Sequence, residues 1–362
     1  MKKIVIGAGL VVLLLPSILS AADWTENVKL KGDIRLRHET IDVEDRDARN
    51  RLRIRARFGI EAKPTDFLKI GFQFASGSDD PISTNQTLDD GFSTKDLRLD
   101  LAYFDFHFDK AVPGMNVLGG KFGNPFYKPG SSELIWDSDI NPEGVVFKYS
   151  GGSDKAEFFA NAGYFSVEER SSDKNTHLAG FQAGAEFSPV TVGFSYFDYI
   201  NIQGYAPIFD PEDPFGNTVM EDEGGDLYYL YDYNLIEIFS EVSFDVNEFP
   251  IRFYGDFVQN TAEGVIEKQG WLVGTKLGEV KDPGSYEIRW IYRMVRNDAV
   301  LAAFNDSDFI DGGTNGKGHE LGIDLQVAKS VMAAATYFIN DRKLTEGGEG
   351  FNRLQLDLNL KF

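Results

Sequence analysis

Arginine occupies every second position in one short segment of the chain. Residues 51–57 read RLRIRAR, so four guanidinium groups alternate with Leu52, Ile54 and Ala56. Because alternate side chains of a β-strand point to opposite faces, these arginines share one face. Such a row can attract anions, and it can equally pair with nearby carboxylates. The full set that we expect on one wall is Arg35, Arg37, Arg51, Arg53, Arg55, Arg57 and Arg353.

Carboxylates gather in a different segment, Asn124–Pro142 and the residue after it. The segment contains proline, glycine and serine at positions that favour a loop over a strand. If it folds toward the arginines, the two sets of charges create an electric field across the space between them. The alternative is a loop that stays outside, with Trp136 packed on a neighbouring loop. The acids concerned are Glu133, Asp137, Asp139 and Glu143.

Motifs for metal binding and catalysis are weak. Asp137, Asp139 and Asn141 have the spacing of the first ligands of a calcium loop, but Pro142 replaces its glycine and Lys148 its closing glutamate. No GxSxG or HExxH motif accompanies the four scattered histidines. We therefore predict no catalytic residues, no cofactor and no resident metal. A second acidic group, which we interpret as solvated, is Asp306, Asp308 and Asp311.

The elements that position these side chains are predicted by alternation with a period of two. In residues 354–362, leucines and a final phenylalanine alternate with polar residues, which is typical of a strand with one apolar and one polar face. Alternation alone also suits a soluble sandwich. The sixteen strands expected are 25–38, 49–62, 67–76, 97–108, 115–123, 143–150, 156–166, 177–187, 190–200, 230–245, 250–260, 270–281, 285–296, 318–328, 331–341 and 351–362.

Connection lengths favour a barrel over a sandwich. Short connections such as Ser188–Pro189 and Lys329–Ser330 alternate with longer ones, up to Asn201–Tyr229. Tight periplasmic turns, long external loops and an even strand number are typical of outer-membrane barrels. The alternation slips phase near Ala102, where we expect a β-bulge.

The amino terminus and the composition limit the class of protein. Residues 1–22 combine Lys2 and Lys3, an apolar run and a small-residue end, and we interpret them as a signal peptide that precedes a barrel over 23–362. The 57 acidic residues against 36 basic ones exclude a basic nucleic-acid binder, and the absence of cysteine excludes a disulfide scaffold. The aromatic content of 14% argues against disorder.

Several patches resemble one known family. Segments Asn124–Tyr149, Pro250–Asn260 and Asp298–Gly322, with GDIRLRHE and RNRLRIRARFGIEAKPTD near the start, are similar to the putative porins of Gram-negative outer membranes. The resemblance implies a β-barrel channel without a defined substrate. The terminal Phe362 resembles the signal by which such barrels are recognised for insertion.

These observations predict an all-β protein: a sixteen-stranded antiparallel transmembrane β-barrel in a Gram-negative outer membrane. We expect a porin that passes small hydrophilic solutes and ions by passive diffusion, between the arginines and an acidic constriction loop. Expected partners are outer-membrane lipid, lipopolysaccharide and the solutes, not nucleic acid; a homotrimer is expected only by analogy with other porins. The alternatives are a barrel acting as receptor or adhesin and, with less support, an outer-membrane hydrolase.

Overall fold

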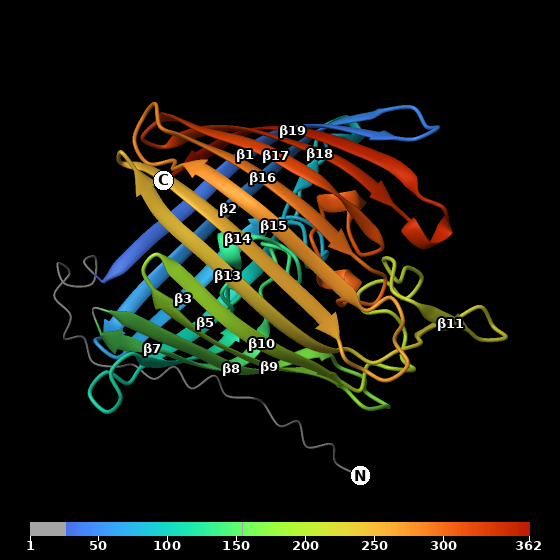
Figure 1. The fold of residues 1–362 in the computed structure, drawn as a ribbon, viewed down its shortest axis with the longest axis horizontal. Helices are drawn as coiled ribbons and strands as arrows, with labels where there is room; N and C mark the ends of the chain where they lie inside the picture. Colours follow the sequence, from blue (N-terminus) through green and yellow to red (C-terminus); the bar gives the residue numbers. More distant parts are fainter. Residues whose placement is uncertain (1–26, 154) are drawn as a thin grey trace, which may run out of the picture.

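Sixteen long strands close into an antiparallel barrel in the computed structural model, which describes residues 27–153 and 155–362 (Figure 1). The predicted fold class is confirmed. The predicted signal peptide, residues 1–22, lies outside the described residues. The strands are β1 (Val28–Val43), β2 (Arg49–Thr65), β3 (Leu68–Ser76), β5 (Leu97–His107), β6 (Met115–Lys121), β7 (Glu143–Ser153), β8 (Ala156–Glu168), β9 (Thr176–Phe187), β10 (Val190–Ile200), β13 (Asn234–Val246), β14 (Phe249–Asn260), β15 (Gln269–Gly278), β16 (Tyr286–Val295), β17 (Gly316–Ala328), β18 (Val331–Arg342) and β19 (Glu349–Lys361).

The barrel closes where the first described strand meets the last. β1 pairs with β2 on one side and with β19 on the other, in a register that runs from Asp33 opposite Lys361 to Val43 opposite Phe351. Three further strands are short: β4 (Gln86–Thr87) pairs with β2, and β11 (Val219–Glu221) forms a separate hairpin with β12 (Leu227–Tyr229). The 3₁₀ helices are η1 (Asp90–Phe92), η2 (Pro129–Ser131), η3 (Ala302–Phe304), η4 (Phe309–Asp311) and η5 (Leu344–Glu346).

No helix in the described part of the chain is long and apolar enough to cross a membrane.

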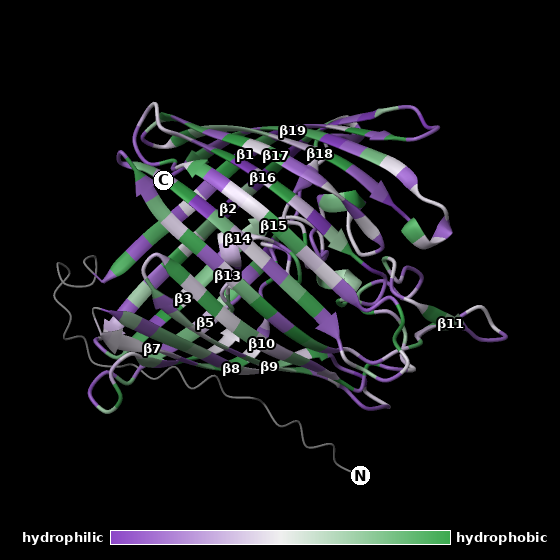
Figure 2. Cartoon of the chain, in the orientation of Figure 1, coloured by the Kyte–Doolittle hydropathy of each residue, from purple (hydrophilic) through white to green (hydrophobic). Residues whose placement is uncertain are grey.

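The two faces of each strand differ in polarity, as the alternation predicts. In β19, Leu356 is 45% exposed on the outer surface, whereas the neighbouring Gln355 is 3% exposed and faces the interior. Bands of apolar and polar residues alternate along the strands in Figure 2. The outer wall is therefore largely apolar, which suits contact with lipid.

The connections also follow the predicted alternation of lengths. One rim has short turns, such as residues 188–189 between β9 and β10 and residues 329–330 between β17 and β18. The opposite rim has the long loops, 77–96, 122–142, 201–233 and 296–315 among them. The start of β1 lies at the short-turn rim, because it pairs with the end of β2, just before the short turn 66–67. The carboxyl end of β19 pairs with the start of β1 and so lies at the same rim.

A bulge in β5 lies two residues from its predicted position. Gln73 of β3 stands opposite Leu101, but the next residue, Phe74, stands opposite Leu99, so Asp100 is the extra residue. Its carboxylate accepts hydrogen bonds from the Gln73 and Asn141 side-chain amides, at 2.7 Å each. The bulge thus turns an acid into the barrel while Leu99 stays on the outer surface.

A hydrophobic core lies inside the barrel, and most of its strand residues belong to β7 to β16. Phe126 and Trp136 of loop 122–142 pack against Phe197 of β10, with ring centroids 4.9 and 5.3 Å away. Trp136 also stacks on Phe304 of loop 296–315 at 6.3 Å. Inward-facing residues of the strands, including Leu235, complete this core. Both loops therefore fold into the barrel and fill part of its interior.

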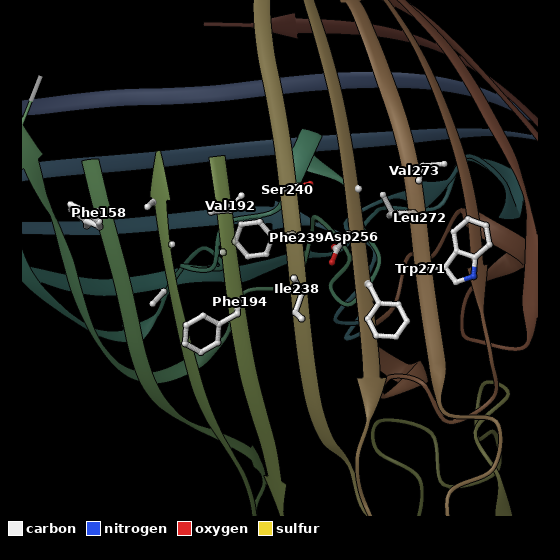
Figure 3. Close-up of a pocket in the computed structure, with 16 residues that line it drawn as sticks. Phe158, Val192, Phe194, Ile238, Phe239, Ser240, Asp256, Trp271, Leu272 and Val273 are labelled. Carbon is white, nitrogen blue, oxygen red and sulfur yellow. The ribbon is translucent and has the colours of Figure 1, made fainter. Parts of the chain in front are cut away.

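The outer wall has a shallow apolar depression over β8 to β15. Glycines on neighbouring strands, among them Gly184, Gly193 and Gly255, leave a hollow of about 840 Å³. Its lining runs from Phe158 on β8 to Trp271 on β15 (Figure 3). The hollow belongs to the outer apolar surface, because its lining residues Phe194, Ile238 and Val273 are exposed there.

The strand assignment makes Leu356 a sensitive probe of the outer wall. Replacing Leu356 by Arg should lower the free energy of unfolding by about 2–4 kcal/mol near the bilayer midplane, because a charge would face hydrocarbon. Denaturant unfolding of the barrel folded in lipid vesicles measures this. Leu356→Phe is the matched control and should unfold like the parent protein. Equal stability of Leu356→Arg and the parent would contradict the assignment.

The charged lumen as candidate functional site

Seven arginines face the interior along three adjacent strands, β2, β1 and β19. The register places Arg35 opposite Arg55 and Arg37 opposite Arg53. Their side chains are between 1% and 27% exposed. We call this set the arginine wall: Arg35, Arg37, Arg51, Arg53, Arg55, Arg57 and Arg353.

One buried carboxylate, Glu39 of β1, holds three members of the arginine wall. Its oxygens lie 2.9 Å from Arg51, 3.2 Å from Arg353 and 3.6 Å from Arg53. The Glu39 side chain has no exposure to solvent. A buried charge is tolerated only when it is paired and hydrogen-bonded. The three arginines are therefore needed to stabilise buried Glu39, in addition to contributing positive charge.

Two further carboxylates come from the strands themselves. Asp33 of β1 lies 2.9 Å from Arg55 and 2.8 Å from Arg57. Asp357 of β19 accepts two hydrogen bonds of 2.8 Å from Arg37. Much of the positive charge of the arginine wall is thus compensated within the sheet.

Loop 296–315 supplies the remaining counter-charges. Asp308 lies 3.0 Å from both Arg37 and Arg353, and Asp311 also pairs with Arg353. The sequence interpretation of these aspartates as solvated is wrong, because the loop folds inward and its acids form ion pairs. The sequence shows the spacing of these aspartates. It does not show that they pair with Arg37 and Arg353, because those arginines are distant along the chain.

Loop 122–142 crosses the interior and rests on the far wall. The Gly130 backbone N–H donates to Glu241 of β13 at 2.7 Å, and the Tyr127 hydroxyl donates to the same carboxylate at 3.0 Å. Gly130 has a φ of +58°, and a Cβ there would collide with the ring of Tyr254 on β14. Glycine is therefore required where η2 approaches the wall.

Three of the four predicted acids of this loop lie inside the barrel. Asp139 lies 3.8 Å from Arg57, at the edge of the arginine wall. Glu133 and Asp137 lie farther along, and their carboxylates come within 4.8 Å of each other and of Asp306. The geometry therefore brings Asp139 to the arginines, but it places Glu133 and Asp137 in a separate acidic group.

Glu143 does not join these acids. As the first residue of β7, it stands opposite Lys121 of β6 in the register. The two side chains pair at 2.9 Å, and that of Glu143 is 61% exposed. The expectation that Glu143 faces the arginines is wrong, because the strand pairing commits its carboxylate to a lysine near the long-loop rim.

Arg293 of β16 joins the two inward loops at the acidic group. It donates to the Glu133 backbone carbonyl at 2.9 Å and to the Asp306 carboxylate at 2.6 Å. Burial, followed by repulsion from Asp306, raises the pKa of Glu133 and of Asp137 well above the usual carboxyl range. The three carboxylates are close enough to share a cation, but Arg293 already compensates part of their charge.

In the described part of the chain, two cavities between the loops and the wall concern these charges. One, of about 380 Å³, is lined by four members of the arginine wall, Arg35, Arg37, Arg55 and Arg57, and on its other sides by acids that include Glu133, Asp137 and Asp306. The other, of about 890 Å³, contains Lys121 and Glu143 in its lining. Asp139 lines both and so lies between them.

The other three members of the arginine wall, Arg51, Arg53 and Arg353, lie beside these cavities and line neither. Loop 77–96 covers one of them, since Arg53 donates to the Ser83 hydroxyl at 3.3 Å. Loop 296–315 covers another, since Arg353 donates to the Ser307 carbonyl at 3.0 Å. These three arginines therefore act on the lumen indirectly, through the ion pairs with Glu39 that they share.

Comparison with known proteins agrees with this architecture. Residues 43–208 and 232–362 match the model of the family described as Putative porin. The chain belongs to this family. No curated protein sequence matches that of this porin.

Solved outer-membrane proteins share the fold of this porin at low sequence identity. OprB of Pseudomonas putida has a TM-score of 0.59 at 12% identity, over 93% of this chain and 95% of that one. Salmonella typhi OmpF, in complex with daunomycin, has a TM-score of 0.55 at 11% identity, over 93% and 98%. OmpT of Vibrio cholerae, in a trimer form, has a TM-score of 0.52 at 14% identity, over 93% and 100%.

Removing the central carboxylate of the arginine wall should destabilise this porin. Glu39→Gln leaves three guanidinium groups without their shared counter-charge, and we expect the free energy of unfolding to fall by about 3–5 kcal/mol. Denaturant unfolding in detergent or lipid measures the change. The control Glu212→Gln removes an exposed loop acid and should shift stability by no more than about 0.5 kcal/mol. Similar unfolding curves for the two variants would contradict the structural role of Glu39.

Proposed function

We propose that this porin conducts small hydrophilic solutes and ions across the outer membrane by passive diffusion. The observation that carries the proposal is the pair of cavities on either side of Asp139, inside a barrel whose family and fold are those of channels rather than enzymes. The path passes between the arginine wall and the acids of the inward loops. Strand number supports this, since barrels of sixteen strands are wide enough to leave an aqueous passage.

Charge inside the lumen is large but nearly balanced. Arg37 and Arg57 each have a carboxylate at 3.0 Å or less. Paired charges attract a passing ion far less than free ones, so we propose weak selectivity between cations and anions. The field between the arginine wall and the acids on the other sides of the cavity, such as Asp306, would still orient a dipolar solute.

The surroundings proposed for this porin are outer-membrane lipid around the apolar outer wall and lipopolysaccharide beside the acidic loops. The belt of exposed residues such as Phe147, Phe253 and Leu325 supports contact with hydrocarbon. A homotrimer is proposed by analogy with the trimer form of Vibrio cholerae OmpT.

If loop 122–142 limits conductance, shortening it should widen the path. Deletion of Lys128–Ile135 removes η2 and its contact with the far wall, and single-channel conductance in a planar bilayer should rise. The matched control deletes the exposed residues Asp222–Asp226 between β11 and β12 and should leave conductance unchanged. Unchanged conductance in a correctly folded Lys128–Ile135 deletion would remove this loop from the conducting path.

Ion preference should depend on pH through the inward loops. Because the pKa values of Glu133 and Asp137 are raised, these groups take up protons at a higher pH than ordinary carboxyl groups. Lowering pH from about 8 to about 5 therefore removes negative charge from the lumen and should increase preference for anions. Reversal potentials in a KCl gradient measure the shift. The double variant Glu133→Gln, Asp137→Asn should shift less, and an equal shift would show that other groups titrate.

A further inference from the structure

The arginine wall contains one more positive charge than its partners compensate. Its seven guanidinium groups have six carboxylates within 4.0 Å among the residues that the structure describes. Several of these carboxylates are shared between arginines. The uncompensated positive charge is therefore assigned to the arginine with the longest and fewest carboxylate contacts. The six carboxylates are Asp33, Glu39, Asp139, Asp308, Asp311 and Asp357.

That arginine is Arg35. Its only carboxylate neighbour in the described chain is Asp357, at 4.0 Å, and Asp357 already accepts two hydrogen bonds from Arg37. Nη2 of Arg35 donates to a neutral acceptor, the Asn85 side-chain carbonyl, at 2.7 Å. Its Nε is shielded from solvent and has no acceptor in the described structure. The remaining nitrogen, Nη1, lies beyond hydrogen-bond distance of Asp357.

Arg53 is the next least compensated, since its Glu39 contact is 3.6 Å long, but it does not line either cavity. Arg35 does line the cavity of about 380 Å³, and its side chain is 13% exposed. Lys361 lines the same cavity. An anion that enters this cavity therefore meets Arg35 with Lys361 on the same wall.

We propose that Arg35 is the principal contact of an anion-binding site in the lumen, and that its ligand is a small monocarboxylate. A guanidinium group matches the geometry of a carboxylate and forms charge-assisted hydrogen bonds with it. The inference rests on the proposed function, because it requires that solutes enter the lumen.

The rest of the cavity explains why a single negative charge is favoured. Its other walls carry six acids against three bases, and the acids still outnumber the bases when Glu133 and Asp137 are protonated, so a second negative charge on the solute would be repelled. The acids are Glu133, Asp137, Glu287, Asp306, Glu320 and Asp324, and the bases are Lys276, Arg289 and Arg293.

Acetate binding to the barrel folded in deuterated detergent tests the site. Saturation-transfer NMR on the acetate methyl signal should give a saturable response with the parent protein and about tenfold weaker binding with Arg35→Gln. The control Arg46→Gln removes an arginine that is 58% exposed and pairs with Glu349 outside the lumen, and it should bind acetate like the parent. Succinate, a dianion near neutral pH, should bind more weakly than acetate.

A second variant keeps Arg35 and supplies the missing counter-charge. Asn359 of β19 stands opposite Arg35 in the register and lines the same cavity. Asn359→Asp should therefore abolish acetate binding even if Arg35→Gln does not fold. If folded Arg35→Gln or folded Asn359→Asp still binds acetate like the parent, the site is overturned. If succinate binds as tightly as acetate, the preference for a single negative charge is overturned. A barrel that binds acetate but passes no current in a planar bilayer would refute the channel and leave the site standing.

Discussion

Burial of Glu39 among Arg51, Arg53 and Arg353 constrains much of the interior. A carboxylate without solvent contact must be matched by positive groups held at short range, because an unpaired charge in a medium of low polarity is strongly unfavourable. The three arginines come from strands on both sides of β1. Arg353 then needs further acceptors, and Asp308 and Asp311 of loop 296–315 provide them. The position of that loop thus follows from the charge of the wall.

Loop 122–142 satisfies a second constraint, because the barrel interior has an apolar side and a charged side. Phe126 and Trp136 pack on the apolar side with Phe197. Asp137 and Asp139 of the same loop face the charged side. A loop with one apolar and one acidic face is stable only at the boundary between the two sides, and this explains why it crosses the interior rather than projecting from the rim.

The sequence predicts the strands well, because alternation records which side of a wall each residue occupies. Residues 354–360 show this, since their leucines lie outside and their polar residues inside. Strand ends are set by packing that alternation does not record. The alternation predicts a strand from residue 230, but β13 begins at Asn234, because Tyr233 belongs to the aromatic packing of the preceding loop. The arginine wall could be assembled from the same alternation. The carboxylates that pair with the arginine wall could not be predicted in this way, because pairs such as Asp308 with Arg37 join residues 271 positions apart. Glu143 was misplaced because the Lys121 that holds it is a cross-strand neighbour, which proximity along the chain does not reveal.

Closure of the barrel through β1 and β19 has a consequence for how the chain folds. The pairing joins residues such as Arg37 and Asp357, which are 320 positions apart, so it is among the most non-local contacts in the molecule. The entropy lost in bringing such distant segments together makes their association slow compared with the formation of the hairpins between them. Until the two strands meet, each exposes an unpaired edge to other chains. The ion pair between Arg37 and Asp357 can form only when that edge is sealed, so its formation marks the end of assembly.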